Sequence, residues 1–247
     1  MQRYFLKNDQ IQSGVVRLTE DDAHHIIRVM RMKVGDEVIV CDENKTSFIV
    51  EISFENNDVL ATIKSLIKYE VELPVSVTIA QGLPKGDKFE WVLQKGTECG
   101  ATHFIPVKMD RSVVKFDVKK EIKKLERWSK IVKEAAEQAH RQVLPTVHSV
   151  VSFKDLLKLR EMYDVCLFAY EETAKIGEMA QLKEALKKVF PGSSILVLVG
   201  PEGGISDSEK NLLVENGFLP CALGPRILRT ETAPIYILSA ISYEFEL

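Results

Sequence analysis

Cysteine is sparse in this sequence and never occurs at a metal-binding spacing. The chain has four cysteines, each more than fifty residues from the next: Cys41, Cys99, Cys166 and Cys221. This argues against a disulfide framework and a compact zinc site, and we expect the thiols to be buried as small apolar groups. The histidines add no metal site, because the adjacent His24 and His25 point different ways and the others stand alone. We therefore expect no metal.

Long apolar runs are also missing. Residues 195–199 form a run of strand length, and residues 233–241 contain a Pro, a Tyr and a Ser, whereas a membrane helix needs about 20 apolar residues. The start of the chain lacks the apolar core of a secretion signal. We therefore expect a cytoplasmic protein with no membrane partner.

The net charge argues against a generally basic protein that binds nucleic acid over its whole surface. The 247 residues are 45% hydrophobic and 28% charged, with a net charge of -3, which is an ordinary globular composition. Residues 71–160, however, hold 17 Lys and Arg against 11 Asp and Glu. Such a local basic surface can bind phosphates, although a solvated helix face with paired charges is the commoner cause of a charge run.

Two sections of the chain differ in rhythm. Residues 1–70 contain short β-type runs separated by turn residues, with one short helix capped by Thr19 and Asp22, and they indicate a small β-barrel-like domain. Residues 69–74 are a plausible linker. From residue 75 onward, strands rich in Val, Ile and Leu alternate with helices, which predicts an α/β domain around a buried parallel sheet.

The second section predicts strands at 75–80, 104–107, 165–169, 194–199 and 219–223, and helices at 85–99, 119–141, 178–189, 207–216 and 233–245. Three helix ends carry chemical signals. Gly100 is suited to end the first helix, Ser206 with Glu209 forms a capping box for the fourth, and Thr232 is the expected cap of the last.

The sharpest feature is the segment 198–206, in which an apolar strand runs into a loop with Gly200, Gly203 and Gly204. Parallel sheets bind ligands outside the carboxyl ends of their strands, and glycine lets the backbone approach a ligand. The loop is not a P-loop, because no Lys-Ser or Lys-Thr follows, and its spacing is not Gly-x-Gly-x-x-Gly. A ligand-binding loop and a plain tight turn both remain open.

A second loop, at residues 222–234, also lies between a predicted strand and a predicted helix. It carries the apolar pair Ile227 and Leu228 beside Arg226, Arg229 and Glu231. This combination suits a pocket for a flat, uncharged ring whose edge pairs with exposed backbone amides. A packed connector whose Ile and Leu plug the core explains the same residues as well.

Further polar groups recur at definite spacings. Glu134, Gln138 and Arg141 are predicted to share one helix face, either against a second subunit or in solvent. Arg111, after a predicted strand, is similarly ambiguous. A short helix in the first section gathers imidazole and cationic groups at His24, His25, Arg28 and Arg31. That cluster does not by itself establish RNA contact.

Together these segments resemble the RsmE family of ribosomal RNA methyltransferases, in the SPOUT superfamily, along essentially the whole chain. The resemblance rests on residues 24–36, 83–88, 94–100 and 134–141, and most specifically on the loops 200–204 and 223–233. It implies a PUA-like β-barrel at residues 1–70, and a SPOUT α/β domain at 74–247 with a parallel sheet and a C-terminal trefoil knot. Knots are nearly absent from proteins, so periodicity alone does not predict one.

The resemblance also implies a donor, a substrate and an assembly. The donor is S-adenosylmethionine, expected to contact Ala169, Val199, Gly200, Glu202, Gly203, Gly204, Leu223, Gly224, Ile227, Leu228, Thr232 and Ala233. The product is N3-methyluridine in the decoding region of 16S ribosomal RNA, on the small subunit. RNA contacts are expected at Arg3, His25, Arg28, Arg31, Arg111, Gln138 and Arg141. The enzyme is expected to be a homodimer whose active site is completed at the subunit interface.

Methylation at N3 needs a uridine that has lost its N3 proton. We expect Arg229 to stabilise the uridine anion. For Glu231 we prefer a structural role, in which it orients Arg229 through a salt bridge. The alternative is that Glu231 accepts the proton. Because N3 lies on the Watson–Crick edge, the base must be unpaired before it reacts.

Two other classes of function fit parts of the sequence. One is a non-catalytic RNA-binding assembly factor with the same fold. The other is a nucleotide hydrolase, against which stand the missing P-loop lysine and the lack of an evident carboxylate cluster for Mg²⁺. Donor binding separates the methyltransferase from the hydrolase, and methyl transfer to RNA separates it from the assembly factor.

Overall fold

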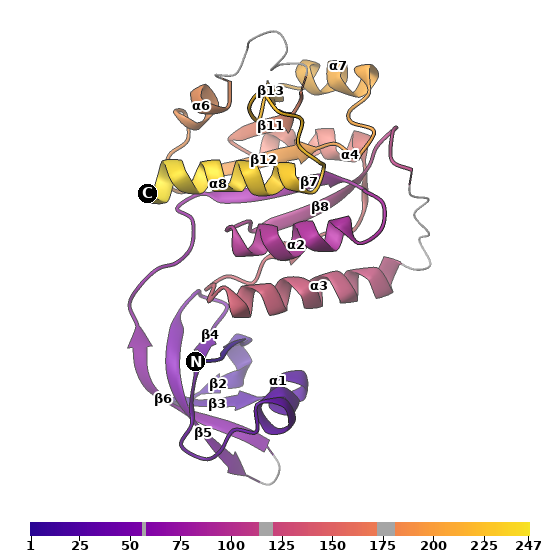
Figure 1. The fold of residues 1–247 in the computed structure, drawn as a ribbon. Helices are drawn as coiled ribbons and strands as arrows, with labels where there is room; N and C mark the ends of the chain where they lie inside the picture. The colour runs from indigo at the N-terminus through magenta and orange to yellow at the C-terminus, as the bar shows by residue number, and fades with distance from the viewer. Residues whose placement is uncertain (56–57, 114–120, 172–180) are drawn as a thin grey trace. The chain divides into compact units, whose positions relative to one another are not determined.

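The computed structural model describes residues 1–55, 58–113, 121–171 and 181–247 (Figure 1). The chain divides into two compact units. Unit 1 consists of Met1–Glu72 together with Ala136–Leu144, and unit 2 consists of Leu73–Ala135 together with Pro145–Leu247. A short segment in the middle of unit 2 therefore belongs to unit 1, which the rhythm of the sequence did not indicate.

Unit 1 is built on a six-stranded mixed sheet in the order β1-β4-β5-β6-β3-β2. Its strands are β1 (Arg3–Phe5), β2 (Ile11–Gln12), β3 (Val15–Leu18), β4 (Glu37–Cys41), β5 (Ser47–Glu55) and β6 (Asp58–Ile67). Alternate residues of β4 and β5, such as Val38, Val40, Val50 and Ile52, turn into one core. No ladder joins β1 to β2 among the residues described, so the curled sheet is not closed as a full barrel.

A short helical segment accompanies this sheet. The 3-10 turn η1 (Asn8–Gln10) follows β1, and α1 (Glu20–His24) continues directly into the π-helical turn η2 (His25–Val29). Thr19 stands at the N-cap position of α1, but its side chain makes no capping hydrogen bond. The capping box expected from Thr19 and Asp22 is therefore not formed. The π-helical turn buries Ile26 and leaves Arg28 exposed.

Unit 2 contains a seven-stranded sheet, and all of its pairings are parallel, as predicted. The order is β10-β8-β7-β12-β11-β13, and β9 also pairs with β8. The strands are β7 (Ser76–Gly82), β8 (His103–Lys108), β9 (Thr146–Val147), β10 (Val151–Ser152), β11 (Val165–Ala169), β12 (Ser194–Val199) and β13 (Leu219–Cys221). The trefoil knot implied by the resemblance stays a prediction.

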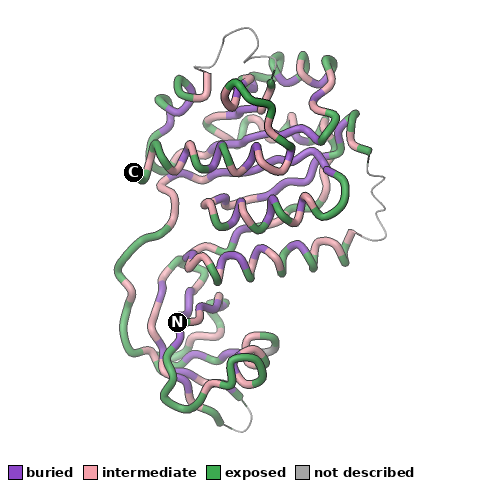
Figure 2. Tube along the Cα trace, in the orientation of Figure 1, coloured by how far each residue is buried: buried purple, intermediate pink, exposed green. Residues whose placement is uncertain are grey.

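Helices cover both faces of this sheet, which explains why its strands are apolar at nearly every position. Odd-numbered residues of β12, such as Ile195 and Val197, pack with α2 (Lys88–Glu98), α3 (Glu121–Gln138), α6 (Gln181–Leu186) and α8 (Thr232–Glu246). Leu196 and Leu198 face the other side, where α4 (Phe153–Lys158), the turn η4 (Leu159–Met162) and α7 (Asp207–Glu215) lie. Figure 2 shows the central strands as largely buried.

The capping signals of unit 2 are confirmed at α7 but not at α8. The predicted capping box on α7 is formed, because Ser206 Oγ accepts from Glu209 N at 3.2 Å and Ser206 N donates to Glu209 Oε2 at 2.9 Å. Thr232 is not the cap of α8, because Glu231 occupies the N-cap position and Thr232 is the first helical residue. The predicted helix starts at residues 119–120 and 178–180 lie outside the described residues.

The thiols behave largely as small apolar groups. Cys41, Cys166 and Cys221 are buried and Cys99 is half-buried, and all four are free. Burial raises the pKa of Cys221 to about 12. Separately, no helix within the described ranges is both long and apolar enough to cross a membrane.

Candidate active site

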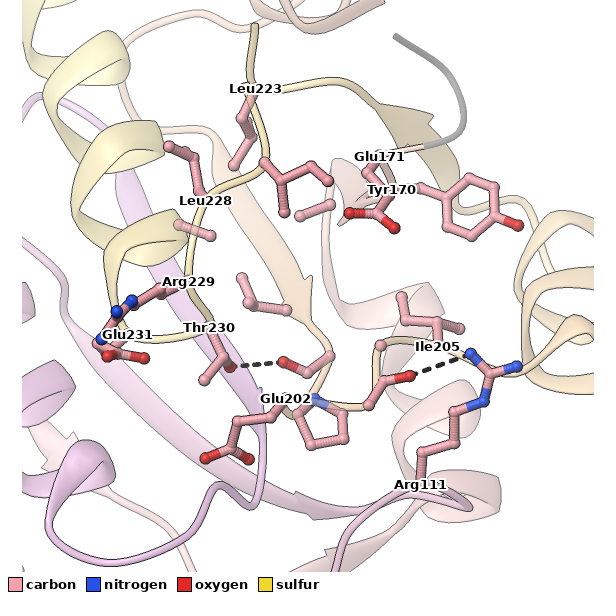
Figure 3. Close-up of a pocket in the computed structure, with 18 of the residues that line it drawn as sticks. Arg111, Tyr170, Glu171, Glu202, Ile205, Leu223, Leu228, Arg229, Thr230 and Glu231 are labelled. Atoms are coloured by element: carbon pink, nitrogen blue, oxygen red, sulfur yellow. Dashed lines mark hydrogen bonds between the residues drawn. The ribbon is translucent and has the colours of Figure 1, made fainter. Parts of the chain in front are cut away.

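Four strand ends meet at the carboxyl edge of the unit 2 sheet. Ala169 of β11 pairs with Cys221 of β13, and Val199 of β12 pairs with Gln81 of β7. The segments that follow these strands therefore leave the sheet at the same edge, where parallel sheets place their ligand sites. They enclose a cleft of about 780 Å³ (Figure 3), a volume typical of small-molecule sites.

The cleft is lined by both loops that the sequence singled out. Every residue predicted to contact the donor borders it except Thr232, which begins α8. Arg229 and Glu231 also line the cleft, and so does Arg111, which was expected to contact RNA. Sequence reasoning missed several lining residues: Lys88, Tyr170, Glu171, Pro201, Ile205, Asp207 and Thr230.

One side of the cleft is apolar. Leu223 and Leu228 are partly buried and pack on the core of unit 2, and Figure 3 shows them on the opposite side of the cleft from Tyr170 and Glu171. The side chain of Ile227 is 75% exposed. The packed-connector interpretation of this loop therefore fits the two leucines but not Ile227.

The glycines of the first loop are required by the loop itself. A Cβ on Gly200 would stand 3.0 Å from the backbone of Gly204, and a Cβ on Gly203 would stand 2.9 Å from Arg111 Cβ. Gly204 has a φ of +73°, which favours glycine. Backbone packing and the approach of Arg111 thus explain why these three positions need glycine, without any role for a ligand.

Thr230 ties the two loops together. Its Oγ1 donates to Gly200 O at 2.6 Å (Figure 3) and accepts from Gln81 Nε2 at 2.8 Å. Gln81 Nε2 also donates to Gly82 O at 3.0 Å. All of these groups are buried, so each needs a partner. A threonine in the second loop was visible in the sequence, but nothing in the spacing indicated its partner in the first.

A charged cluster stands at the rim of the cleft. Lys88 Nζ donates to Glu202 Oε1 at 2.8 Å and lies 3.7 Å from Glu231 Oε2. The backbone N–H of Lys85 donates to Glu202 Oε1 at 3.1 Å. Burial opposes the ionisation of Glu202, but the hydrogen bonds from Lys88 and from the backbone lower its pKa overall.

The salt bridge expected between Arg229 and Glu231 is not formed in the described part of the chain. Both residues lie on the same edge of the cleft (Figure 3), yet the cation within ion-pair distance of Glu231 is Lys88. Glu231 Oε2 is buried and accepts no hydrogen bond from the described residues. The ion pair through which Glu231 was expected to orient Arg229 is therefore not formed, and Glu231 Oε2 is left as a buried acceptor without a hydrogen bond.

Arg111 belongs to the cleft as much as to the surface. Its Nη1 donates to Gly203 O at 3.0 Å (Figure 3), although the residue is exposed. The neighbouring Asp110 N donates to Glu209 Oε1 at 2.8 Å, and Ser206 Oγ donates to Asp110 Oδ2 at 2.9 Å. The segment that carries Arg111 is therefore fixed to the start of α7.

Two residues predicted to bind RNA are buried instead. α3 ends at Gln138, and His140 turns the chain with a φ of +55°, so Arg141 does not continue the helix face of Glu134 and Gln138. The Arg141 side chain is 4% exposed and is ion-paired with Glu72. Arg3 is 1% exposed and donates to Arg141 O at 2.7 Å. Contact with phosphates requires a side chain at the surface. The burial of Arg3 and Arg141 therefore contradicts the RNA contacts predicted for them.

The remaining predicted RNA contacts lie at the surface of unit 1. Arg28, Arg31 and Gln138 are exposed. His25 is half-buried, and its Nδ1 forms a hydrogen bond with Tyr4 Oη at 2.9 Å. Arg28 and Arg31 lie within and just after the π-helical turn, so they remain free to meet phosphates.

Comparisons with known proteins agree along the whole chain. A family model described as an RNA methyltransferase domain matches residues 71–242, and one described as an RNA methyltransferase PUA domain matches residues 18–64. The chain is 47% identical to ribosomal RNA small subunit methyltransferase E of Bacillus subtilis, covering 100% of this chain and 98% of that protein. The corresponding Synechocystis protein is 34% identical, covering 97% and 77%.

Solved structures show the same relationship. The structure of a ribosomal RNA small subunit methyltransferase E from Neisseria gonorrhoeae bound to S-adenosyl methionine aligns with a TM-score of 0.84, at 28% identity, and covers 99% of this chain and 98% of that one. A predicted RNA methyltransferase from Thermotoga maritima shares the fold, with a TM-score of 0.65 at 24% identity and coverage of 99% and 98%. The two-loop cleft thus lies in a chain that belongs to the ribosomal RNA small subunit methyltransferase E family.

Proposed function

We propose that this protein methylates N3 of a uridine in the decoding region of 16S ribosomal RNA, in the cytoplasm, with S-adenosylmethionine as donor. Family membership supports the donor and the RNA. The observation that carries the choice of N3 is that Glu231, a residue lining the cleft, has an acceptor oxygen without a hydrogen bond from the described residues. Uridine N3 carries a hydrogen that such an oxygen can accept, whereas cytidine N3 carries none.

The residues of the cleft fit the proposed donor. Leu223, Ile227 and Leu228 offer an apolar side for its adenine ring. The carboxylate of Glu171 lies opposite them (Figure 3) and has the charge that suits the cationic groups of the donor. When bound, S-adenosylmethionine supplies a methyl group made electrophilic by its sulfonium sulfur.

The protein prepares the nucleophile. We assign Glu231 as the acceptor of the N3 proton, because the residue lines the cleft and its Oε2 accepts no hydrogen bond from the described residues. We assign Arg229 to the uridine anion, because its exposed guanidinium lies on the same edge of the cleft (Figure 3). RNA contacts are proposed at His25, Arg28, Arg31, Gln138 and Arg111.

Calorimetry with S-adenosylmethionine and with ATP tests the donor. The proposal expects S-adenosylmethionine to bind and ATP not to bind. ATP binding in the cleft would support a hydrolase instead. Incubation with labelled donor and either 16S RNA or small subunits then tests catalysis. A protein that binds donor and RNA but transfers no methyl group would be an assembly factor.

We also propose that the protein works as a homodimer, as the family resemblance implies. α8 leaves Tyr243 72% exposed near the end of the chain, which supports an apolar contact. Sedimentation at micromolar concentration tests this, and a monomer would contradict it.

A further inference from the structure

Glu231 holds an oxygen for which the described chain supplies no donor. Its Oε2 is buried without a hydrogen bond, and its side chain is 17% exposed. Burying an acceptor without a partner costs free energy. Glu231 lines the cleft, so a rotation of its side chain would present this oxygen to a donor on a bound substrate.

Lys88 is the cation beside this oxygen, at 3.7 Å. It is the first residue of α2, a position at which the helix dipole disfavours positive charge. The hydrogen bond with Glu202 raises the pKa of Lys88, and the negative charges of Glu202 and Glu231 add to this, while burial and Arg229 oppose it. The side chain is therefore held as an ammonium by carboxylates from two other segments.

The geometry separates the two carboxylates into different roles. Glu202 is fully engaged, because Lys88 Nζ and the backbone N–H of Lys85 both donate to it. Glu231 is only attracted, because 3.7 Å is too long for a hydrogen bond. Glu202 thus anchors Lys88, and Lys88 keeps its charge beside Glu231 without occupying the open oxygen.

We propose that Lys88 is a positioning residue for the proton transfer that precedes methylation. The inference rests on the proposed function, since it takes uridine N3 as the proton donor. In this step the N3–H bond breaks, its electron pair stays on N3, and the proton passes to Glu231 Oε2. The negative charge moves from the carboxylate to the hydrogen-bonded ring, and the fixed ammonium of Lys88 stabilises the uridine anion as it forms. The charged groups that act on Lys88 are Glu202, Glu231 and Arg229.

Three variants test this role. Lys88→Met keeps the unbranched side chain up to the position of Cε and removes the charge, and Lys88→Arg restores the charge. Lys85→Met is the matched control, because it removes a cation from the same segment while its backbone N–H still holds Glu202. In single-turnover methylation we expect Lys88→Met to be slower by about a hundredfold. Lys88→Arg regains most of the rate, and Lys85→Met and the donor affinity of all variants change little.

A substrate with a more acidic N3 separates proton transfer from a structural clamp. Fluorine at C5 of the target uridine acidifies N3–H, so the deficit of Lys88→Met shrinks on 5-fluorouridine RNA. Bound with S-adenosylhomocysteine at one fixed pH, this RNA also reports its ionisation by ¹⁹F NMR, and we expect a larger ionised fraction in the wild type than in Lys88→Met.

Three results would overturn the inference: a Lys88→Met rate equal to that of Lys85→Met, an equal deficit on both RNAs, or equal ionised fractions. An inactive wild type would contradict the proposed function itself. An active wild type with an unaffected Lys88→Met contradicts only the role of Lys88.

Discussion

A single hydroxyl group, that of Thr230, connects the two loops of the cleft. Thr230→Val removes the hydroxyl that joins Gly200 O to Gln81 Nε2. We expect a loss of about 1 kcal/mol in the free energy of unfolding, together with weaker binding of S-adenosylmethionine, because the two loops lose their connection. Urea unfolding and calorimetry measure the two effects. Thr230→Ser is the control and keeps both, whereas a Val variant as stable as wild type would contradict the account.

His103 and His148 predict a pH dependence at the amino end of β8. Their Nδ1 and Nε2 atoms lie 3.2 Å apart. Burial lowers the pKa of both, and for His103 the neighbouring His148 adds to the shift. A lowered pKa means that the unfolded chain binds protons more readily, so stability falls as the pH drops below about 6.5. Thermal unfolding should show a smaller loss between pH 7 and pH 5 for His148→Gln, and identical curves would exclude this cause.

The sequence predicted the cleft residues that follow strands better than the residues whose hydrogen bonds fix the loops in place. Gly200 was found because it comes directly after an apolar strand, and Leu223 because it ends the predicted strand at 219–223. Thr230 and Lys88 were missed because their partners, Gly200 and Glu202, come from distant segments of the chain. Arg3 was misread for the same reason, since a lone cation near the start of a chain gives no sign of burial.

At the scale of the element, the start of α7 links the glycine loop to the segment that carries Arg111. Ser206→Ala removes the capping hydroxyl, which also donates to Asp110. We expect a cost of about 1 kcal/mol and weaker donor binding. Ser208→Ala is the matched control, because Ser208 contacts the same carboxylate at 3.3 Å but does not cap the helix. Chemical unfolding of both variants checks this, and equal losses would contradict it.

The long elements were predictable and the short ones were not. β12 was predicted at residues 194–199 with both ends correct, because five apolar residues follow Ser194 without a break. β1, β2 and β3 contain too few residues for periodicity to be visible. The end of α3 at Gln138 also escaped, because helical spacing continues to Arg141 while His140 adopts a positive φ.

Across the whole molecule, we propose that only a small subset of the arginines contacts RNA. Arg28→Ala should weaken RNA binding and lower the slope of log affinity against log salt by about 1, without changing donor affinity. Arg17→Ala is the control, because Arg17 is exposed but already paired with Asp58. Binding measured at several salt concentrations decides this. A slope that is equal for Arg28→Ala and wild type would remove Arg28 from the interface.

The buried charges of unit 1 predict a stability effect instead. Glu72 accepts hydrogen bonds from Arg141 and from the backbone N–H groups of Gln142 and Val143. Glu72→Gln removes a negative charge that pairs with the buried Arg141 guanidinium, so we expect a loss of about 3 kcal/mol. Thermal unfolding measures this loss of stability, and an unchanged midpoint would show that the ion pair does not stabilise the fold.

The central claim is that the two-loop cleft places a methyl group on uridine N3 of small-subunit ribosomal RNA. Its most direct test is mass spectrometry of nucleosides from 16S RNA treated with the protein and isotope-labelled S-adenosylmethionine. We expect labelled N3-methyluridine at one site of the RNA, and we expect this product to be lost with the Glu231→Gln variant. Label on a ribose or on another base, or none at all, would contradict it.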